Sequence, residues 1–434
     1  MRILLIKPSI SKSILGRYRL NDAPMEPLSL AILAALVPAG HEVTLIDERI
    51  QPVPSGATFD LVGITTDTWS ASRAYELADG FRRQGSRVVL GGIHASLLPE
   101  EAGGHADAVL IGDAEEAWPE LIADFGRGQL EPFYRGTQNC PQRDGLVPRR
   151  DLLGGKDYLP ISLVQSSRGC TFNCHFCSVS RFFNRRLHHR PVDEVVREIE
   201  RLERRTVLFV DDNLTLDRNR AKELIRAIKP LKIRWASQAG IDMTEDEELL
   251  ELMAESGCVG HLIGFESVTE DSLRWLNKSR NLRGFDRYQS VLSRLRKHGL
   301  LTWASFIIGN DHDTRETIRE TVQFATESRF TLAFFHLLMP YPGTELYDRL
   351  SGEGRLLYEG RWWTHPRFTY NSAAFLPRHM RPEELGELAE WANRAFYSTS
   401  SIARRLLDPS THMSSLYHLL FYLRFNLLLR ITST

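Results

Sequence analysis

The chain has 434 residues, of which 42% are hydrophobic and 25% are charged, and its formal net charge is -1. These values are usual for a folded globular protein of two or three domains. The near-neutral charge, with no acidic or basic tail, argues against a nucleic-acid partner, and no segment offers the ~20 apolar residues of a membrane span.

Short apolar runs alternate with amphipathic segments over the first 136 residues. The runs typical of buried strands are residues 3–6, 43–46, 61–64, 88–90 and 108–111. Segments typical of helices lie between them, for example residues 28–36 and 71–83. This alternation predicts an α/β domain over residues 1–136 with a doubly wound (Rossmann-like) parallel sheet. The first run is too short for a signal peptide, so we expect a cytoplasmic protein.

Two loops of the predicted sheet follow strands at the edge where such sheets bind ligands. The loop after the fourth strand reads Gly91-Gly92-Ile93-His94, and the loop after the fifth reads Gly112-Asp113-Ala114-Glu115. In doubly wound sheets, ligands bind at the carboxyl ends of the strands. We therefore expect a ligand at this edge.

A polar stretch rich in Gly and Pro, residues 137–155, is interpreted as a linker. A second βα series follows over residues 156–345, with expected strands at residues 161–165, 207–210, 233–237, 259–265, 302–308 and 332–339. Helical segments separate them, for example residues 193–203, 245–256 and 314–327. Six βα units predict a partial, TIM-type (β/α)6 barrel, whose site lies at the carboxyl ends of its strands.

The remaining residues, 346–434, predict a small and mostly helical C-terminal region, with helix expected over residues 382–407. Residues 416–431 are strongly apolar but are interrupted by His418, Arg424, Asn426 and Arg430. Such a segment fits a terminal helix packed on the core, which we favour. It also fits a helix lying on a membrane surface.

Three of the five cysteines, Cys170, Cys174 and Cys177, fall within eight residues, after the first strand of the second domain. The other two, Cys140 and Cys258, are isolated, which does not suggest a disulfide framework. Thiolates are the ligands of iron–sulfur clusters, and three of them leave one iron of a 4Fe–4S cluster open to a small molecule. A structural zinc site would need four ligands, usually in two pairs.

The C-x3-C-x2-C spacing, with Phe176 before the last cysteine, resembles the radical S-adenosylmethionine (SAM) superfamily. The resemblance implies that the three cysteines hold a catalytic 4Fe–4S cluster. It further implies that SAM binds the open iron and is cleaved to a 5′-deoxyadenosyl radical. Polar ends of later strands are similar to the SAM-binding segments of that family. They supply the expected contacts Phe176, Asp211, Asp212, Ser237, Gln238, Glu266 and Gly309. Asp211 and Asp212 also fit a plain capped turn after a strand.

The order of the two domains resembles the cobalamin-binding subclass of this superfamily. The phrases that carry the resemblance imply cobalamin contacts at Thr65, Thr66, Gly91, Gly92, His94, Gly112 and Glu115. The small residues would let backbone approach a large flat ring. Many such domains coordinate cobalt through Asp-x-His-x-x-Gly, which is absent here. His94 fits a hydrogen bond to the corrin and the end of a strand equally well.

The segment from Met339 through Trp362 and Trp363 to Ser398 resembles the branch that holds the hopanoid C-2 methylase and the bacteriochlorophyll methyltransferases and cyclase. Its aromatic residues fit a substrate pocket or a packed cap over the barrel. The resemblance implies a cobalamin-dependent C-methyltransferase of secondary metabolism that acts on a small or lipid-like molecule, with a reductant such as flavodoxin or ferredoxin. A cyclase or rearrangement enzyme is the nearest alternative. A non-catalytic iron–sulfur protein would not need the SAM segments.

Overall fold

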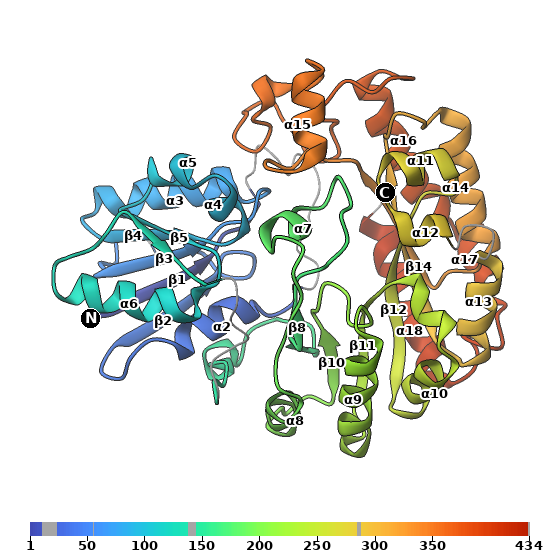
Figure 1. The fold of residues 1–434 in the computed structure, drawn as a ribbon, viewed down its shortest axis with the longest axis horizontal. Coiled ribbons are helices and arrows are strands. Elements are labelled where there is room, and N and C mark those ends of the chain that lie inside the picture. Colours follow the sequence, from blue (N-terminus) through green and yellow to red (C-terminus); the bar gives the residue numbers. More distant parts are fainter. Residues whose placement is uncertain (11–23, 55, 138–144, 284–287, 433–434) are drawn as a thin grey trace.

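The computed structural model describes residues 1–10, 24–54, 56–137, 145–283 and 288–432 (Figure 1). Cys140 and most of the first half of the expected linker lie outside the described residues. Two parallel sheets of six strands form the frame of the molecule, one in each of the two lobes of Figure 1. The predicted fold class is confirmed.

The first sheet has the strand order β2-β1-β3-β4-β5-β6, and every neighbouring pair is parallel. Its strands are β1 (Arg2–Lys7), β2 (Glu42–Asp47), β3 (Leu61–Thr65), β4 (Arg87–Gly91), β5 (Ala108–Ile111) and β6 (Phe133–Arg135). The strand β6 was not predicted, because three residues with one buried side chain give no apolar run.

Helices cover both faces of the first sheet because successive side chains of a strand point to opposite faces. Leu4 and Ile6 of β1 pack in one core with α3 (Ala71–Arg83), while Ile3 and Leu5 pack in another with α2 (Leu28–Ala35) and α6 (Ala114–Gly126). Two short helices, α4 (Ile93–Leu97) and α5 (Pro99–Gly103), lie on the α3 side.

The second sheet is an open barrel with the strand order β7-β10-β11-β12-β13-β14, again all parallel. Its strands are β7 (Ser162–Val164), β10 (Thr206–Phe209), β11 (Arg234–Ala239), β12 (Cys258–Glu266), β13 (Leu301–Ile308) and β14 (Leu332–Leu337). Helices that follow these strands are α8 (Val192–Glu200), α9 (Arg218–Ile228), α10 (Glu247–Glu255), α13 (Tyr288–Lys297) and α14 (Arg315–Glu327). Caps fix several of their starts; Thr314 and Thr317 form a capping box at α14.

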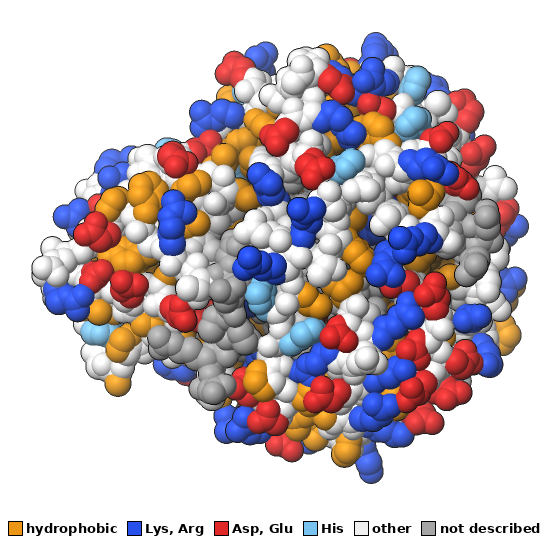
Figure 2. Space-filling view, viewed as in Figure 1, with side chains coloured by type: hydrophobic (Ala, Val, Ile, Leu, Met, Phe, Trp, Pro, Cys, Tyr) orange, Lys and Arg blue, Asp and Glu red, His pale blue; other side chains and the backbone are white. Residues whose placement is uncertain are grey.

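The C-terminal region continues the helical layer and closes the gap between the lobes. Its helices are α15 (Glu345–Gly352), α16 (Pro382–Phe396), α17 (Thr399–Leu406) and α18 (Leu416–Thr432). Figure 1 shows α15 above and between the two lobes and α16 beside the barrel. On the face drawn in Figure 2, acidic and basic side chains are interspersed. Within the described ranges, no helix is long and apolar enough to cross a bilayer.

Candidate functional site

The loop with the three cysteines leaves the barrel at β8 (Ser167–Arg168) and ends at α7 (Ser178–Phe182). It begins at Gly169, whose φ is +87° and whose missing Cβ would lie 2.2 Å from the carbonyl oxygen of Arg186, so only glycine fits. The Gly169 amide donates to the Asp212 carboxylate (2.8 Å). Farther along, the Cys177 amide donates to the Cys174 carbonyl (3.1 Å). These contacts hold the loop against the carboxyl edge of the barrel.

The donor set of this loop fits an iron–sulfur cluster better than a single metal ion. Cys174 is buried and Cys170 is half-buried, and burial raises the pKa of both thiols, that of Cys174 to about 12. Among the residues described, no three His, Cys, Asp or Glu side chains converge as ligands of one ion. His175, between the thiols, instead contacts the Trp275 carbonyl (3.1 Å) and Glu345 (3.2 Å). A cube-shaped cluster takes one thiolate at each of three separate irons, which leaves the fourth iron open.

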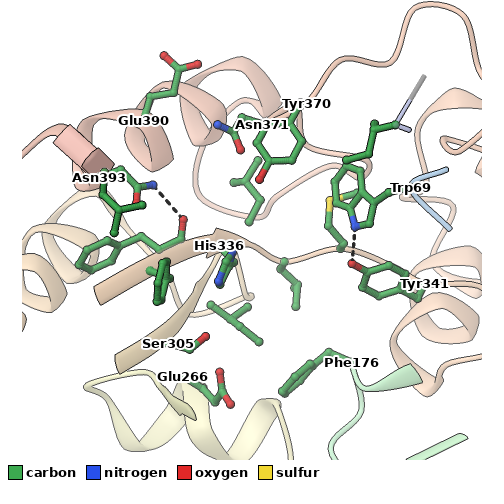
Figure 3. A pocket seen from close by; sticks show the side chains of 18 of the residues that line it. Trp69, Phe176, Glu266, Ser305, His336, Tyr341, Tyr370, Asn371, Glu390 and Asn393 are labelled. Atoms are coloured by element: carbon green, nitrogen blue, oxygen red, sulfur yellow. Dashed lines mark hydrogen bonds between the residues drawn. The ribbon is translucent and has the colours of Figure 1, made fainter. Parts of the chain in front are cut away.

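A cavity of about 820 Å³ opens beside this loop, at the carboxyl edge of the barrel (Figure 3). Two of the predicted SAM residues, Phe176 and Glu266, line it. Glu266 lies at a β-bulge with φ +64°, an uncommon conformation for a non-glycine residue. Its carboxylate accepts a hydrogen bond from the Lys278 ammonium (2.7 Å).

Two other predicted SAM residues lie near the loop or at a strand end but are not among the lining residues of this cavity. Asp212 accepts the Gly169 bond already described, and burial raises the pKa of its carboxyl. Gln238 is exposed near the end of β11, where its carbonyl accepts the Leu214 amide (3.1 Å).

The structure does not bring Asp211, Ser237 and Gly309 into this cavity. Asp211 is fully buried and accepts bonds from the backbone and hydroxyl of Ser166 and from the Ser167 hydroxyl, as a strand-end cap does. Ser237 alternates with Gln238 and points to the opposite face, where it contacts His261 (2.9 Å). Gly309 packs under α16, because a Cβ there would lie 2.6 Å from Leu385.

The opposite walls of the cavity come from distant parts of the chain, and no sequence motif singled out Trp69 or His336. Trp69, in the loop after β3 of the first sheet, donates its indole N–H to the Tyr341 hydroxyl (2.8 Å), and both residues line the cavity. The barrel contributes Ser305 and His336, and the C-terminal region contributes Tyr370, Asn371, Glu390, Asn393, Leu428 and Leu429. The cavity is thus bounded by all three parts of the chain (Figure 3).

His336 is a polar residue of β14 that is exposed to the cavity. Desolvation lowers the pKa of its imidazole, and the nearby Glu266 carboxylate partly offsets this effect. The ring is therefore neutral near pH 7. Such a ring offers one donor and one acceptor to a bound molecule.

The aromatic residues expected to line a substrate pocket divide into two groups. Tyr341 lines the cavity, whereas Trp362, Trp363, Phe396 and Tyr397 are at most 2% exposed and pack in the core. The Trp362 indole donates to the Pro340 carbonyl (3.0 Å). For these four residues, the structure shows the packed cap.

A second cavity, of about 310 Å³, lies at the carboxyl edge of the first sheet, between α2 and α6. Five of the predicted cobalamin residues line it together: Thr65, Gly91, Gly92, Gly112 and Glu115. Gly92 has φ +101° and a Cβ there would lie 2.8 Å from the Thr66 carbonyl oxygen, so backbone forms this wall. Leu28, Ile32 and Trp118 supply apolar surface opposite. A slot of this kind, walled by backbone and apolar side chains, fits a flat organic group.

The other two predicted cobalamin residues, Thr66 and His94, do not line this slot. His94 is fully buried and contacts Thr68 (3.3 Å) and Glu101 (3.4 Å). Glu101 also accepts bonds from the Tyr75 hydroxyl, the Trp363 indole and Arg361. Burial alone would raise the pKa of Glu101, but its hydrogen bonds with His94, Trp363 and Tyr75 outweigh burial and hold the pKa at about 2. This cluster joins α5 of the first domain to the C-terminal region.

Arg168, immediately before the cysteine loop, connects the loop to the slot. Its guanidinium lies 2.6 Å from Glu115 and 3.4 Å from Asp113, both at the start of α6. All three side chains are largely buried. Glu115 thus faces the cluster loop as well as the slot.

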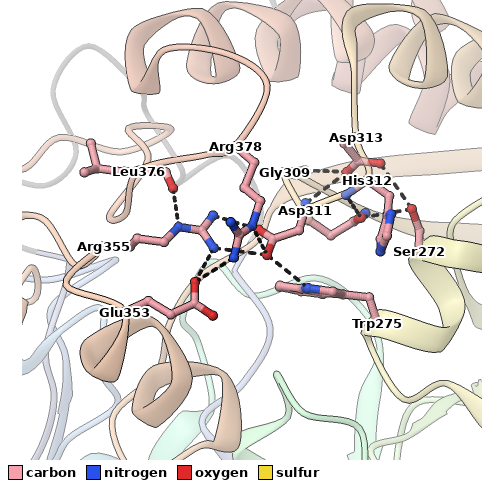
Figure 4. Close-up of polar contacts among 11 residues, drawn as sticks. Ser272, Trp275, Gly309, Asp311, His312, Asp313, Glu353, Arg355, Leu376 and Arg378 are labelled. Atoms are coloured by element: carbon pink, nitrogen blue, oxygen red, sulfur yellow. Dashed lines mark hydrogen bonds and ion pairs between the residues drawn. The ribbon is translucent and has the colours of Figure 1, made fainter.

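On the other side of the barrel mouth, the loop after β13 is held by charged contacts (Figure 4). Asp311 accepts bonds from Trp275, Arg355 and Arg378, and these two arginines come from the C-terminal region. Burial alone would raise the pKa of Asp311, but the two guanidinium groups lower it. Asp313 accepts the Gly309 amide (2.7 Å), and burial raises its pKa to about 6. These contacts hold residues 309–313 in place, which indicates a structural role for this segment.

Comparison with known proteins agrees with this arrangement. The model of the radical SAM superfamily matches residues 164–325, and that of the B12 binding domain matches residues 22–122. The cytidylyl-2-hydroxyethylphosphonate methyltransferase of Streptomyces wedmorensis is 32% identical over 91% of this chain and 90% of its own. The bacteriochlorophyllide d C-12(1)-methyltransferase of Chlorobaculum tepidum is 29% identical over 93% of this chain and 89% of its own.

Among solved structures, the radical SAM methyltransferase TsrM of Kitasatospora setae, with cobalamin and a 4Fe–4S cluster bound, has a similar fold. The TM-score is 0.61 at 20% identity, over 81% of this chain and 78% of that one. Fold, thiol loop and paired cavities define a radical SAM enzyme preceded by a cobalamin domain. The chain belongs to the B12-binding radical SAM family, and the predicted enzyme class, a methyltransferase with a 4Fe–4S cluster, SAM and cobalamin as cofactors, is confirmed.

Proposed function

We propose that the protein replaces a hydrogen on an unactivated carbon of a small or lipid-like metabolite by a methyl group. One observation carries this proposal. The large cavity is bounded at once by Phe176 of the cluster loop, by Trp69 of the B12-binding domain and by the C-terminal helices. A substrate in it therefore reaches both halves of the molecule.

Within this proposal, Cys170, Cys174 and Cys177 hold the cluster, and Phe176 and Glu266, which line the large cavity, contact SAM. Thr65, Gly91, Gly92, Gly112 and Glu115 would hold cobalamin. When bound, the cluster and SAM supply a carbon-centred radical, and cobalamin supplies the methyl group. The protein positions substrate between them and excludes water from the cavity.

Two further parts of the proposal concern the source of electrons for the reaction and the cellular compartment of the protein. The reaction takes electrons from an external reductant, for which a flavodoxin or a ferredoxin is the expected class. An iron–sulfur cluster with an open iron is stable only in a reducing compartment, so the proposed location is the cytoplasm.

Anaerobic reconstitution with iron, sulfide, cobalamin and SAM tests the proposal. Candidate substrates are incubated with reductant, and products are measured by mass spectrometry together with 5′-deoxyadenosine. A gain of one methylene per turnover supports methyl transfer. Turnover of substrate without that gain would assign the enzyme to cyclisation or rearrangement instead.

A further inference from the structure

The last helix, α18, presents an apolar stripe to solvent. Leu416, Leu420, Leu427 and Ile431 are 71%, 56%, 50% and 72% exposed. Their spacing of four, seven and four residues puts all four on one side of the helix. They account for four of the eleven large hydrophobic residues that are exposed in the described part of the chain.

This stripe does not result from a loosely attached helix. On the opposite side, Tyr422 and Asn426 are fully buried. The Tyr422 hydroxyl donates to the Ile402 carbonyl (2.7 Å), and the Asn426 amide donates to the Thr331 carbonyl (3.0 Å). Phe421 stacks on Trp303 of β13, with ring centroids 5.6 Å apart. The helix is anchored, and its exposed leucines occupy fixed positions.

The charged residues of this last segment have one sign. The sequence from Pro409 to Thr434 contains no Asp or Glu, whereas Arg424 and Arg430 are exposed on the two sides of the stripe. Neither arginine takes part in an ion pair among the described residues. An apolar face flanked by arginines is the pattern of helices that lie in the interface of an anionic bilayer.

The same helix also forms a wall of the large cavity. Leu428 and Leu429, the neighbours of exposed Leu427, line that cavity. A molecule that leaves a bilayer beside the stripe would meet the cavity within one turn of the helix.

We propose that the exposed face of α18 rests on an anionic lipid surface and that the substrate is an amphiphile taken from that surface. The substrate part of this inference rests on the proposed function; the surface part does not. A second copy of the chain fits the stripe less well. A stable dimer buries about 20 residues on each side, whereas the stripe has four. In such a dimer, Arg424 and Arg430 of one copy would also face the same arginines of the other copy.

Flotation of the full-length, reconstituted protein with vesicles tests the surface. Vesicles of phosphatidylglycerol and phosphatidylcholine are compared with vesicles of phosphatidylcholine alone, at low and high salt. We expect the protein to float with the anionic vesicles and less at high salt. Leu427→Gln should weaken binding about fivefold, and Leu420→Gln with Leu427→Gln about twentyfold, as apolar area is lost from the interface.

Leu376→Gln is the matched control, because Leu376 is an exposed leucine (43%) that is not part of α18. It should bind vesicles like the wild type. Neither Leu420 nor Leu427 lines the cavity, so SAM cleavage without vesicles should be unchanged in all variants. Vesicle binding needs no turnover, so a failure of methyl transfer leaves this measurement intact.

Three outcomes would overturn the inference. The first is wild-type protein that does not float with anionic vesicles. The second is equal flotation of the Leu427→Gln and wild-type proteins. The third is a concentration-dependent dimer in analytical ultracentrifugation that the double variant abolishes, which would assign the stripe to a second copy.

Discussion

The carboxyl edge of the barrel presents reactive side chains, whereas the carboxyl edge of the first sheet presents backbone. At the barrel, Glu266 and His336 line a wide cavity beside the loop that carries the three thiols. At the first sheet, Gly91, Gly92 and Gly112 border a narrow slot. Both sheets are parallel and six-stranded, so topology alone does not cause the difference. One edge is suited to bond breaking, and the other to holding a large group by its shape.

The largest expected effect is at the thiols, because a loop that has lost one of its three thiolates cannot hold the cluster as before. Cys174→Ala should lose bound iron and reduce SAM cleavage to background, as measured by iron content and 5′-deoxyadenosine. Cys258→Ala is the control: its thiol is buried against His261 (3.3 Å), away from the loop. Loss of iron in both variants would show that the assay reports folding rather than ligation.

At the first sheet, the corresponding test changes shape rather than chemistry. Gly92→Ala combines strain at φ +101° with a close contact to the Thr66 carbonyl, and strain alone costs about 1–3 kcal/mol. Bound cobalamin should fall about tenfold, which corresponds to about 1.4 kcal/mol, while SAM cleavage at the barrel remains. Cobalt content after desalting and 5′-deoxyadenosine measure the two separately.

Gly85→Ala provides the control for strain. Gly85 has φ +88°, but nothing lies within 4 Å of its missing Cβ. It should lose stability in a denaturation experiment and keep cobalamin. If both variants lost cobalt equally, the slot would not be the reason.

The two edges are joined by the ion pair between Arg168 and Glu115, and weakening it should separate the two halves of the reaction. Glu115→Gln removes the charge from the side of the first sheet without touching the cysteine loop. We expect the ratio of methylated product to 5′-deoxyadenosine to fall roughly fivefold, equivalent to about 1 kcal/mol of lost positioning.

Glu198→Gln is matched to this variant, because Glu198 pairs with Arg190 (2.7 Å) of the barrel and with Arg150 (2.6 Å), and none of these three residues lines the slot. It should cost stability and leave the product ratio unchanged. A drop of the ratio in Glu198→Gln as large as in Glu115→Gln would contradict a specific link between the cofactor sites.

The sequence predicts the two edges unequally well. All eleven strands expected from apolar runs are present, since a buried parallel strand is a short continuous apolar segment. The cysteine loop is also local, because its three predicted ligands lie within eight residues. The lining of the large cavity is not local: Trp69 and Tyr341 meet across 272 positions, and Glu390 and Leu429 join them from the end of the chain. The hydrophobic periodicity of a sequence does not indicate contacts between residues so far apart.

His94 and Ser237 show a second limit. Both follow or end a strand where ligand-binding residues gather, yet His94 turns into the Glu101 cluster and Ser237 toward His261. A motif gives the position along the chain, whereas the partner that satisfies a polar side chain is set by packing. One partner of His94 is the Glu101 carboxylate. This carboxylate also accepts a hydrogen bond from Trp363, which is 262 positions from Glu101 along the chain.

The smallest expected effect is at His336. This side chain faces the cavity but is not among the residues proposed to bind a cofactor, so its substitution tests substrate binding at the barrel edge separately. A neutral ring exposed in a largely apolar cavity is placed to exchange hydrogen bonds with substrate, and such a bond contributes about 0.5–1.5 kcal/mol. His336→Gln should therefore raise KM for the substrate about threefold, in the lower part of that range, and leave kcat and substrate-free SAM cleavage nearly unchanged. His379→Gln, at an exposed position outside this cavity, serves as the control and should change neither constant. If His336→Gln instead lowered kcat with KM constant, His336 would act in the transition state, and the barrel edge would recognise substrate through other residues, with Glu390 and Asn393 the next to test.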